Sequence, residues 1–279
     1  MSNFINSNVI AYNSPLSHWN GTLKDGRYVI KRGGIDFEFL IQNTLLHSNK
    51  KIFVLLSGAR DPKSHPIPKF DRWKWVDKFP GIMINVSDPA FYKKENSIRI
   101  GWYTGSRECN YIKNISYIIS ELAAGFQISS KDIIFYGSSA GGFASLALAS
   151  HVQGATAVAI NPQINVLKYN LKHVVNNFLS YVYQVKITEL TDQDMIRLDA
   201  SRMFSLAKSA KCLYVQNVLD FHHYEDHYEY FINSLSKESS VKHCSRLETL
   251  LFSSKAGHGP EPGSLVGEII EKALSLSNK

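Results

Sequence analysis

The sequence predicts an α/β protein, a mostly parallel sheet flanked by helices, in a single domain over residues 1–279. Continuous apolar runs of strand length recur at residues 52–56, 82–86, 133–136 and 155–160, and segments with helical spacing of apolar residues alternate with them. Runs that are apolar throughout are typical of parallel strands buried on both faces. With 44% hydrophobic residues, the chain is long enough to bury one substantial core.

The other elements are expected on both sides of these strands. Residues 27–31 and 35–41 alternate in polarity around Gly33-Gly34, which predicts an antiparallel hairpin at one edge of the sheet. Later strands are expected at 212–217 and 247–252. The expected helices are a short one at 71–79 and longer ones at 108–124, 222–235 and 264–276.

The stretch from Lys131 to Ser150 carries the main functional motif. Its strand breaks at Gly137 and a helical pattern follows, so that GSSAG, residues 137–141, fits G-x-S-x-G. In that motif a sharp turn between a strand and a helix holds the central serine above the sheet. Ser139 is therefore the candidate nucleophile. The alternative is a turn of small residues that only packs tightly.

A serine hydroxyl needs a base within hydrogen-bond reach and a third group that orients the base. Asp220 follows the strand at 212–217, and His258 lies between two glycines in the loop after the strand at 247–252. The order serine, acid, histidine is that of the α/β-hydrolase arrangement. We predict that His258 is the base and Asp220 the orienting acid; the rival acids are Asp226, Glu225 and Asp88.

The predicted oxyanion hole combines two backbone N–H groups. Ala140 begins the helix after the nucleophile, so its N–H can donate to an oxyanion. The second N–H is expected in the loop after residue 56, at Ala59 or its neighbour Gly58.

Candidate substrate contacts are Arg60 in this loop and the aromatic residue Trp102. Aromatic rings offer faces on which a sugar can pack, and further such rings are Trp73, Trp75 and Tyr103.

Residues 163–209 have no strand pattern and carry apolar residues at helical spacing. In a hydrolase-like fold, this position is where a helical cap grows and shapes the substrate pocket, so we expect a cap insertion here. Ordinary helices that cover the sheet are the alternative.

His222, His223 and His227 form a cluster in which the last two share one helix face. No glutamate follows the first histidine as in H-E-x-x-H, and no distant ligand is evident. The sequence therefore predicts no metal site, and a polar helix start beside the acid loop instead.

Composition limits the partners and the compartment. The three cysteines, Cys109, Cys212 and Cys244, form neither a disulfide framework nor paired metal spacing, and no secretory or membrane-spanning pattern is present. We expect reduced thiols and a cytoplasmic protein without membrane insertion. The net charge of +7 favours an anionic partner, or reflects scattered solvated lysines. We expect an anionic glycan rather than nucleic acid, and the sequence allows a homo-oligomer.

The runs FYGSSAGGFASLALAS and AINPQINVLKY, together with the later AGHG, resemble the α/β-hydrolase-fold O-acetyltransferases of bacterial capsule biosynthesis, the group that contains the serogroup A meningococcal enzyme. The resemblance is best over residues 132–169 and 257–259, and poor over the first fifty residues and over 60–103. It implies acetyl transfer from acetyl-CoA to sugar hydroxyls, with Ser139, Asp220 and His258 in the triad places.

The sequence thus predicts a serine acyltransferase that O-acetylates a bacterial polysaccharide, with acetyl-CoA as co-substrate and no tightly bound cofactor. A carbohydrate esterase with the same triad is one alternative, because water could accept the acyl group instead. A catalytically idle protein of this fold, acting in polysaccharide assembly, is the other.

Overall fold

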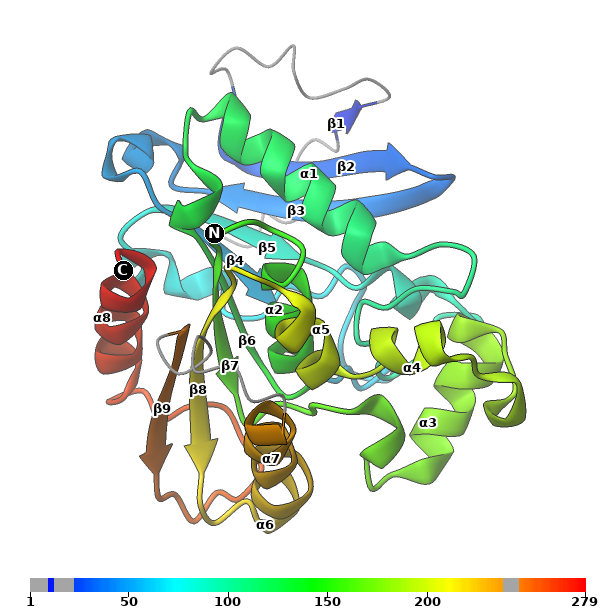
Figure 1. Ribbon diagram of the computed structural model, residues 1–279. Coiled ribbons are helices and arrows are strands. Elements are labelled where there is room, and N and C mark those ends of the chain that lie inside the picture. Colours follow the sequence, from blue (N-terminus) through cyan, green and yellow to red (C-terminus); the bar gives the residue numbers. More distant parts are fainter. Residues whose placement is uncertain (1–9, 13–22, 238–245) are drawn as a thin grey trace.

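A computed structural model describes residues 10–12, 23–237 and 246–279. Within these ranges one nine-stranded sheet has the order β1-β2-β3-β5-β4-β6-β7-β8-β9 (Figure 1). The six strands from β4 to β9 pair in parallel, whereas β3 is antiparallel to both of its neighbours, β2 and β5. The predicted class, a mostly parallel sheet flanked by helices, is confirmed.

Each strand that the sequence predicts is present, and the Gly33-Gly34 turn joins the predicted hairpin. The three-residue β1 was not predicted; it is too short to carry a periodic signal. The strands are β1 (Ile10–Tyr12), β2 (Gly26–Arg32), β3 (Ile35–Gln42), β4 (Ile52–Leu56), β5 (Ile82–Val86), β6 (Ile133–Ser138), β7 (Thr156–Ile160), β8 (Lys211–Asn217) and β9 (Leu247–Phe252).

The helices match the predicted segments with two differences in type. The short helix predicted at 71–79 is a 3₁₀ helix, Trp73–Lys78, and the helix predicted at 222–235 contains a π-helical segment, Tyr224–Glu229. The α-helices are α1 (Tyr111–Gly125), α2 (Ala140–Ala149), α3 (Lys172–Phe178), α4 (Asp192–Arg197), α5 (Ala200–Leu206), α6 (Phe221–His223), α7 (Tyr230–Lys237) and α8 (Val266–Ser277).

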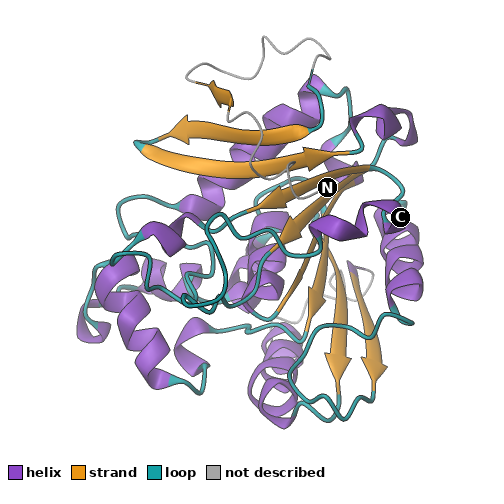
Figure 2. Cartoon of the chain, turned by 180° about the vertical axis from the view of Figure 1, so that it is seen from behind, coloured by secondary structure: helices purple, strands orange, loops and turns teal. Residues whose placement is uncertain are grey.

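Helices cover both faces of the sheet, as Figure 1 and the reverse view in Figure 2 show. Alternate residues of a strand point to opposite faces. Val54 of β4 accordingly lies in the core under α1, α2, α5 and α7, whereas Phe53 lies in the second core, under α8 and the 3₁₀ helix. Both faces of the central strands are therefore buried, which explains why their sequences are mostly apolar.

The segment 163–209 forms helices, as its apolar spacing predicts. Its last helix, α5, packs against α2 and α7 and so covers the sheet. Its first α-helix, α3, places Phe178 against Trp102, with ring centroids 5.1 Å apart. The role of this segment as a cap over substrate stays a prediction.

Two of the three cysteines and the lengths of the helices can be compared with the sequence-based expectations. Cys109 and Cys212 are free thiols, and Cys244 lies outside the described residues. In the ranges that the structure describes, no helix is long and apolar enough to cross a membrane.

A buried carboxylate ties α4 to the rest of the chain. Asp194 accepts hydrogen bonds from the Tyr183 hydroxyl at 2.6 Å, from the Arg107 guanidinium at 2.6 Å, and from the Thr191 backbone N–H at 2.8 Å. Burial alone would raise the pKa of Asp194, but these hydrogen bonds outweigh it and hold the pKa well below its usual range.

The depressed pKa of Asp194 predicts acid-sensitive stability. A carboxyl whose pKa is lower in the folded than in the unfolded state stabilises the fold above the unfolded pKa, about 4. That stabilisation is lost as the pH falls further, toward the folded pKa. At pH 7 we expect Asp194→Asn to lower the free energy of unfolding by about 2 kcal/mol, with a smaller difference from wild type at pH 3. Urea denaturation at both pH values measures this.

Asp192→Asn is the matched control, because Asp192 is exposed on the same helix. Its effect should stay under about 1 kcal/mol. An Asp194→Asn deficit that is as large at pH 3 as at pH 7 would show that the charge of the carboxylate is not what stabilises α4.

Candidate active site

The turn between β6 and α2 holds Ser139 in a strained conformation. Its backbone has φ 57° and ψ −122°, which side chains with a Cβ rarely adopt. Its N–H donates to the Ile160 carbonyl at 2.9 Å, which anchors the turn to β7. Helix α2 comes so close to the sheet that a Cβ on Gly141 would lie 2.5 Å from the Leu56 carbonyl oxygen. Small residues are therefore a steric requirement of this turn.

The structure brings the three predicted triad residues together from distant parts of the chain. Ser139 Oγ lies 3.0 Å from His258 Nε2, and His258 Nδ1 lies 2.7 Å from Asp220 Oδ2. The side chain of His258 is 38% exposed and that of Asp220 only 5%. The serine and the base thus face solvent, whereas the acid is shielded behind them.

Asp220 also binds a second histidine, which the sequence did not identify as part of this site. His223 Nδ1 lies 3.0 Å from Asp220 Oδ1, and the His223 ring stacks on the His258 ring at 3.8 Å with an interplanar angle of 9°. Burial alone would raise the pKa of the Asp220 carboxyl. The hydrogen bonds from His223 and His258 outweigh it and hold the pKa well below its usual range.

The ionised Asp220 determines the tautomers around it. A carboxylate only accepts hydrogen bonds, so the Nδ1 atoms of both His258 and His223 are donors. Burial lowers the pKa of His223 to about 4, so this ring is neutral at pH 7. Nε2 of a neutral His258 then carries a lone pair toward Ser139 Oγ, as a general base requires.

Two asparagines hold the His258 loop by its backbone. Asn217, at the end of β8, donates from Nδ2 to the Gly257 carbonyl at 2.8 Å, and Asn161, just after β7, donates to the Gly259 carbonyl at 3.1 Å. Asn161 Oδ1 in turn accepts from the Asn217 N–H at 2.7 Å. Both carbonyls that flank His258 are therefore fixed. A polar residue at the carboxyl end of each of two apolar strands was the available sequence signal for this pair.

A buried ion pair fastens the same loop to β6. Glu261 accepts two bonds from the Arg72 guanidinium, at 2.6 and 2.8 Å, and one from the Tyr136 hydroxyl at 2.7 Å. Arg72 also donates to the Ser138 hydroxyl at 3.0 Å, next to Ser139. Both charged side chains are almost fully buried, with 6% of Arg72 and none of Glu261 exposed.

A cleft of about 400 Å³ opens beside Ser139 and His258. Its remaining lining residues are Gly58, Ala59, Asp71, Arg72, Trp75, Ser138, Gly259 and Pro260. A larger hollow of about 700 Å³, beside Arg107 and Asp194, contains none of the triad residues. The cleft at Ser139 is the one positioned to hold a reacting group.

The two predicted oxyanion donors from the loop after β4 differ. Both residues line the cleft, but the Gly58 N–H donates to the Asp71 carboxylate at 3.0 Å and is therefore engaged. Ala140 begins α2, where a helix leaves its first N–H groups without intrahelical partners. Ala59 and Ala140 are thus the better placed pair.

The predicted substrate contacts Arg60 and Trp102 lie away from the cleft. Arg60 is 3% exposed and donates to the carbonyls of His65, at 2.9 Å, and Asn96. Trp102 is fully buried and donates from its indole nitrogen to Gln163 Oε1 at 2.6 Å. Both side chains therefore support loops, and neither offers a surface to a substrate. Of the other aromatic candidates, Tyr103 is buried, whereas Trp75 lines the cleft.

The rival acids are bound elsewhere or exposed. Asp88 is buried and accepts from the N–H groups of Ala90 and Tyr103, and burial raises its pKa to about 6. Asp226 pairs with His222 at 2.8 Å, and Glu225 is exposed. Only Asp220, among the four candidate acids, contacts His258.

Comparison with known proteins identifies the fold. No family model matches the chain. Three similar solved structures are a putative dipeptidyl aminopeptidase IV from Bacteroides ovatus (13% identity, TM-score 0.62), an acylaminoacyl peptidase from Pyrococcus horikoshii (15%, 0.61) and a dipeptidyl peptidase 4 from Porphyromonas gingivalis (13%, 0.60). The matches cover 91%, 92% and 92% of this chain but only 35%, 41% and 36% of those chains. The chain has the α/β-hydrolase fold. It spans only about two fifths, or less, of the length of these peptidases.

The buried ion pair between Arg72 and Glu261 predicts a large loss of stability when one partner is removed. Glu261→Gln leaves the Arg72 guanidinium buried without its counter-charge, so we expect the free energy of unfolding to fall by about 3 kcal/mol. Glu268→Gln is the matched control, because Glu268 forms an exposed pair with Lys272 at 3.9 Å. It should change the same quantity by less than about 1 kcal/mol. Equal losses in the two variants, measured by urea denaturation, would contradict a special role for the buried pair.

Proposed function

We propose that this protein is an enzyme that transfers acyl groups through a covalent acyl-serine at Ser139. The observation that carries the proposal is the chain of hydrogen bonds from Ser139 through His258 to Asp220, next to an open cleft. A partly exposed serine on a strained turn, an imidazole nitrogen 3.0 Å from its hydroxyl and a carboxylate bound to that imidazole are what nucleophilic catalysis by serine requires. A protein that only binds glycans would need none of the three.

In the first step Ser139 Oγ attacks the acyl carbonyl while its proton passes to His258 Nε2. The new imidazolium is stabilised by Asp220, and the charge on the former carbonyl oxygen by the Ala140 and Ala59 N–H groups. The bond to the leaving group then breaks, and His258 returns the proton to that group. An acyl-serine remains.

The acyl acceptor decides the reaction class. We propose that it is a carbohydrate hydroxyl and that the donor is acetyl-CoA, whose thiol leaves in the first step. The resemblance to capsule O-acetyltransferases and the aromatic ring of Trp75 in the cleft support this choice. The net charge of +7 favours a glycan that contains uronate or phosphate.

A second candidate is hydrolysis, in which water resolves the acyl-serine. The solved structures with a similar fold are named as peptidases, which favours a peptide or ester substrate. Both reactions use the same first step, so they differ only in whether the cleft admits a sugar hydroxyl or water to His258.

The acyl-serine is the first test. Wild-type protein mixed with acetyl-CoA should gain one acetyl group on the peptide that contains Ser139, as measured by mass spectrometry. Ser139→Ala should abolish this label and lower turnover by ~10³ or more. Unchanged labelling or turnover in Ser139→Ala would remove this residue from the mechanism.

The acceptor is tested on the same preparation. Acetyl-CoA consumption should be slow alone and faster with an anionic capsular glycan, with the acetyl group recovered as an alkali-labile ester on the glycan. A panel of acetyl esters and aminoacyl or dipeptidyl anilides tests the second candidate. Rapid cleavage of any of these, without acetylation of a glycan, would replace the transferase proposal by hydrolysis.

The identity of the acid predicts a ranking of variants. Asp220→Asn should lower kcat by a factor of ~10³ to 10⁴, because the amide cannot hold both imidazoles in the required tautomers. Glu225→Gln is the control from the following helical segment and should leave kcat within about twofold. A silent Asp220→Asn in steady-state kinetics would mean that His258 is oriented by another group.

A further inference from the structure

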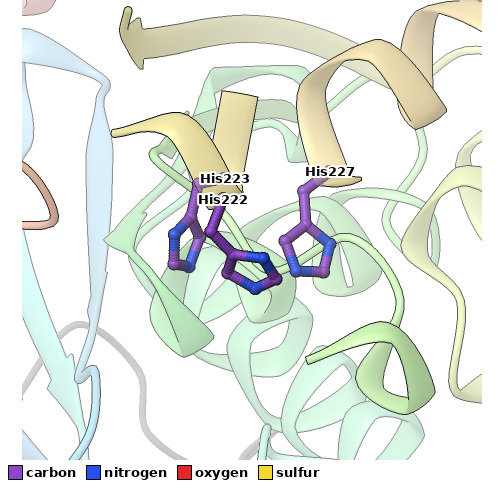
Figure 3. Close-up of side chains that lie close together, drawn as sticks. All are labelled: His222, His223 and His227. Carbon is purple, nitrogen blue, oxygen red and sulfur yellow. The ribbon is translucent and has the colours of Figure 1, made fainter. Parts of the chain in front are cut away.

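Three histidines form a compact cluster immediately after β8. His222 and His223 lie in α6, and His227 lies in the π-helical segment that follows, so that their side chains converge (Figure 3). The ring centroids are 5.0, 5.1 and 5.4 Å apart, and one nitrogen from each ring lies within 4.8 Å of the other two. His223 and His227 are buried, with 3% and 0% of their surface exposed.

The Nδ1 atoms of these rings all have partners. His222 Nδ1 lies 2.8 Å from Asp226 Oδ2, His223 Nδ1 lies 3.0 Å from Asp220 Oδ1, and the Ile164 N–H donates to His227 Nδ1 at 3.1 Å. The Nε2 atoms of all three are buried and have no hydrogen-bond partner in the described part of the chain. Buried polar atoms are rarely left unpaired, so three in one cluster point to a ligand.

The surroundings of two of the rings are those of metal-binding histidines. A carboxylate that accepts a hydrogen bond from Nδ1–H leaves the lone pair of the imidazole on Nε2. Histidines that bind a metal commonly donate from their other ring nitrogen to such a carboxylate. Asp226 and Asp220 take this place for His222 and His223. Imidazole ligands suit zinc, copper, nickel and iron.

The spacing is slightly wider than a bound ion requires. A tetrahedral ion with metal–nitrogen bonds of about 2.1 Å holds its ligand nitrogens roughly 3.4 Å apart. Nitrogens within 4.8 Å of one another reach that spacing when each ring moves by about an ångström or less. Rotation about side-chain torsions allows a movement of this size without a change in the helix.

His227 is the ring that must change its hydrogen bonding. Because its Nδ1 accepts from the Ile164 N–H, its proton is on Nε2. To bind an ion, that proton moves to Nδ1 and the bond from Ile164 is given up. Ion binding thereby costs this hydrogen bond and leaves the buried Ile164 N–H without its acceptor, and the metal–nitrogen bond must outweigh both.

We propose that His222, His223 and His227 bind one divalent transition-metal ion of the zinc class through their Nε2 atoms. The ion binds Nε2 of His223, whereas Nδ1 of the same ring donates to Asp220, and the proposed acyl-transfer steps do not use the ion. The sequence pattern did not favour a metal here because it offers no H-E-x-x-H spacing, whereas the π-helical segment places the third ring in reach. The proposal does not depend on the proposed acyl chemistry.

The test is metal binding to the full chain after treatment with a chelator and dialysis. Titration with Co²⁺ should give the visible absorption of a site with nitrogen ligands and saturate at one ion per chain, and Zn²⁺ should displace the Co²⁺. His222→Gln and His227→Gln should each weaken binding at least 100-fold. His222 is the safer variant for folding, because its side chain is partly exposed, and circular dichroism confirms the fold of both.

Two control variants exclude other sites. Asp220, His223 and His258 also bring ligand atoms within 4.8 Å of one another, so His258→Gln tests whether the ion binds in the triad. His173→Gln tests binding by an exposed histidine on α3. Both should bind Co²⁺ within about threefold of wild type. The proposal is overturned if wild type fails to bind one ion, if His222→Gln keeps full affinity, or if His258→Gln loses it.

Discussion

The left-handed backbone at Ser139 is the constraint on which the rest of the site depends. A residue held in such a sparsely populated region costs on the order of 1–3 kcal/mol and persists only where its surroundings over-determine it. Here the Ile160 carbonyl holds the Ser139 N–H, and the packing of Gly141 against Leu56 leaves α2 no other position. The strained backbone of Ser139 directs its Oγ away from the strand and toward His258. A residue with ordinary strand angles would instead place its side chain against the sheet.

The base is positioned by backbone contacts of its loop more than by its own packing. His258 is partly exposed, yet the carbonyls before and after it are bound by Asn217 and Asn161, and Glu261 anchors the next turn to Arg72. These partners come from the carboxyl ends of β7 and β8 and from the loop before the 3₁₀ helix Trp73–Lys78. The parallel sheet makes this possible, because it brings the ends of its strands to one edge.

Asp220 accepts hydrogen bonds from two histidines, His258 and His223, which lie in different parts of the site. One of its oxygens accepts from His258, which contacts Ser139, and the other accepts from His223, which belongs to the histidine cluster. The two rings stack face to face, so any charge on His223 would act directly on His258. Burial keeps His223 neutral at pH 7 when no ion is bound to it, and the imidazolium that the proposed acyl transfer forms on His258 then meets no like charge there.

The sequence by itself determined the layers of this fold and the three residues of the triad. Apolar runs of strand length predict buried parallel strands wherever they occur, and G-x-S-x-G works only at a strand–turn–helix connection, so Ser139 could be identified from local pattern alone. Asp220 and His258 could be named because this fold places them after successive strands. These are constraints between near neighbours in the chain or between consecutive elements.

Only the tertiary structure decided which other side chains meet there. Trp102 and Arg60 occur in loops and carry groups suited to binding, yet they are buried, because packing against Phe178 and bonds to loop carbonyls use their surfaces. Conversely, Glu261 has no local signature of a role, and only their place at the ends of strands marks Asn161 and Asn217. The partners by which they hold the His258 loop lie between 40 and 189 residues away in sequence. Contacts over such separations depend on how strands and loops are brought together, and local residue spacing carries no record of that.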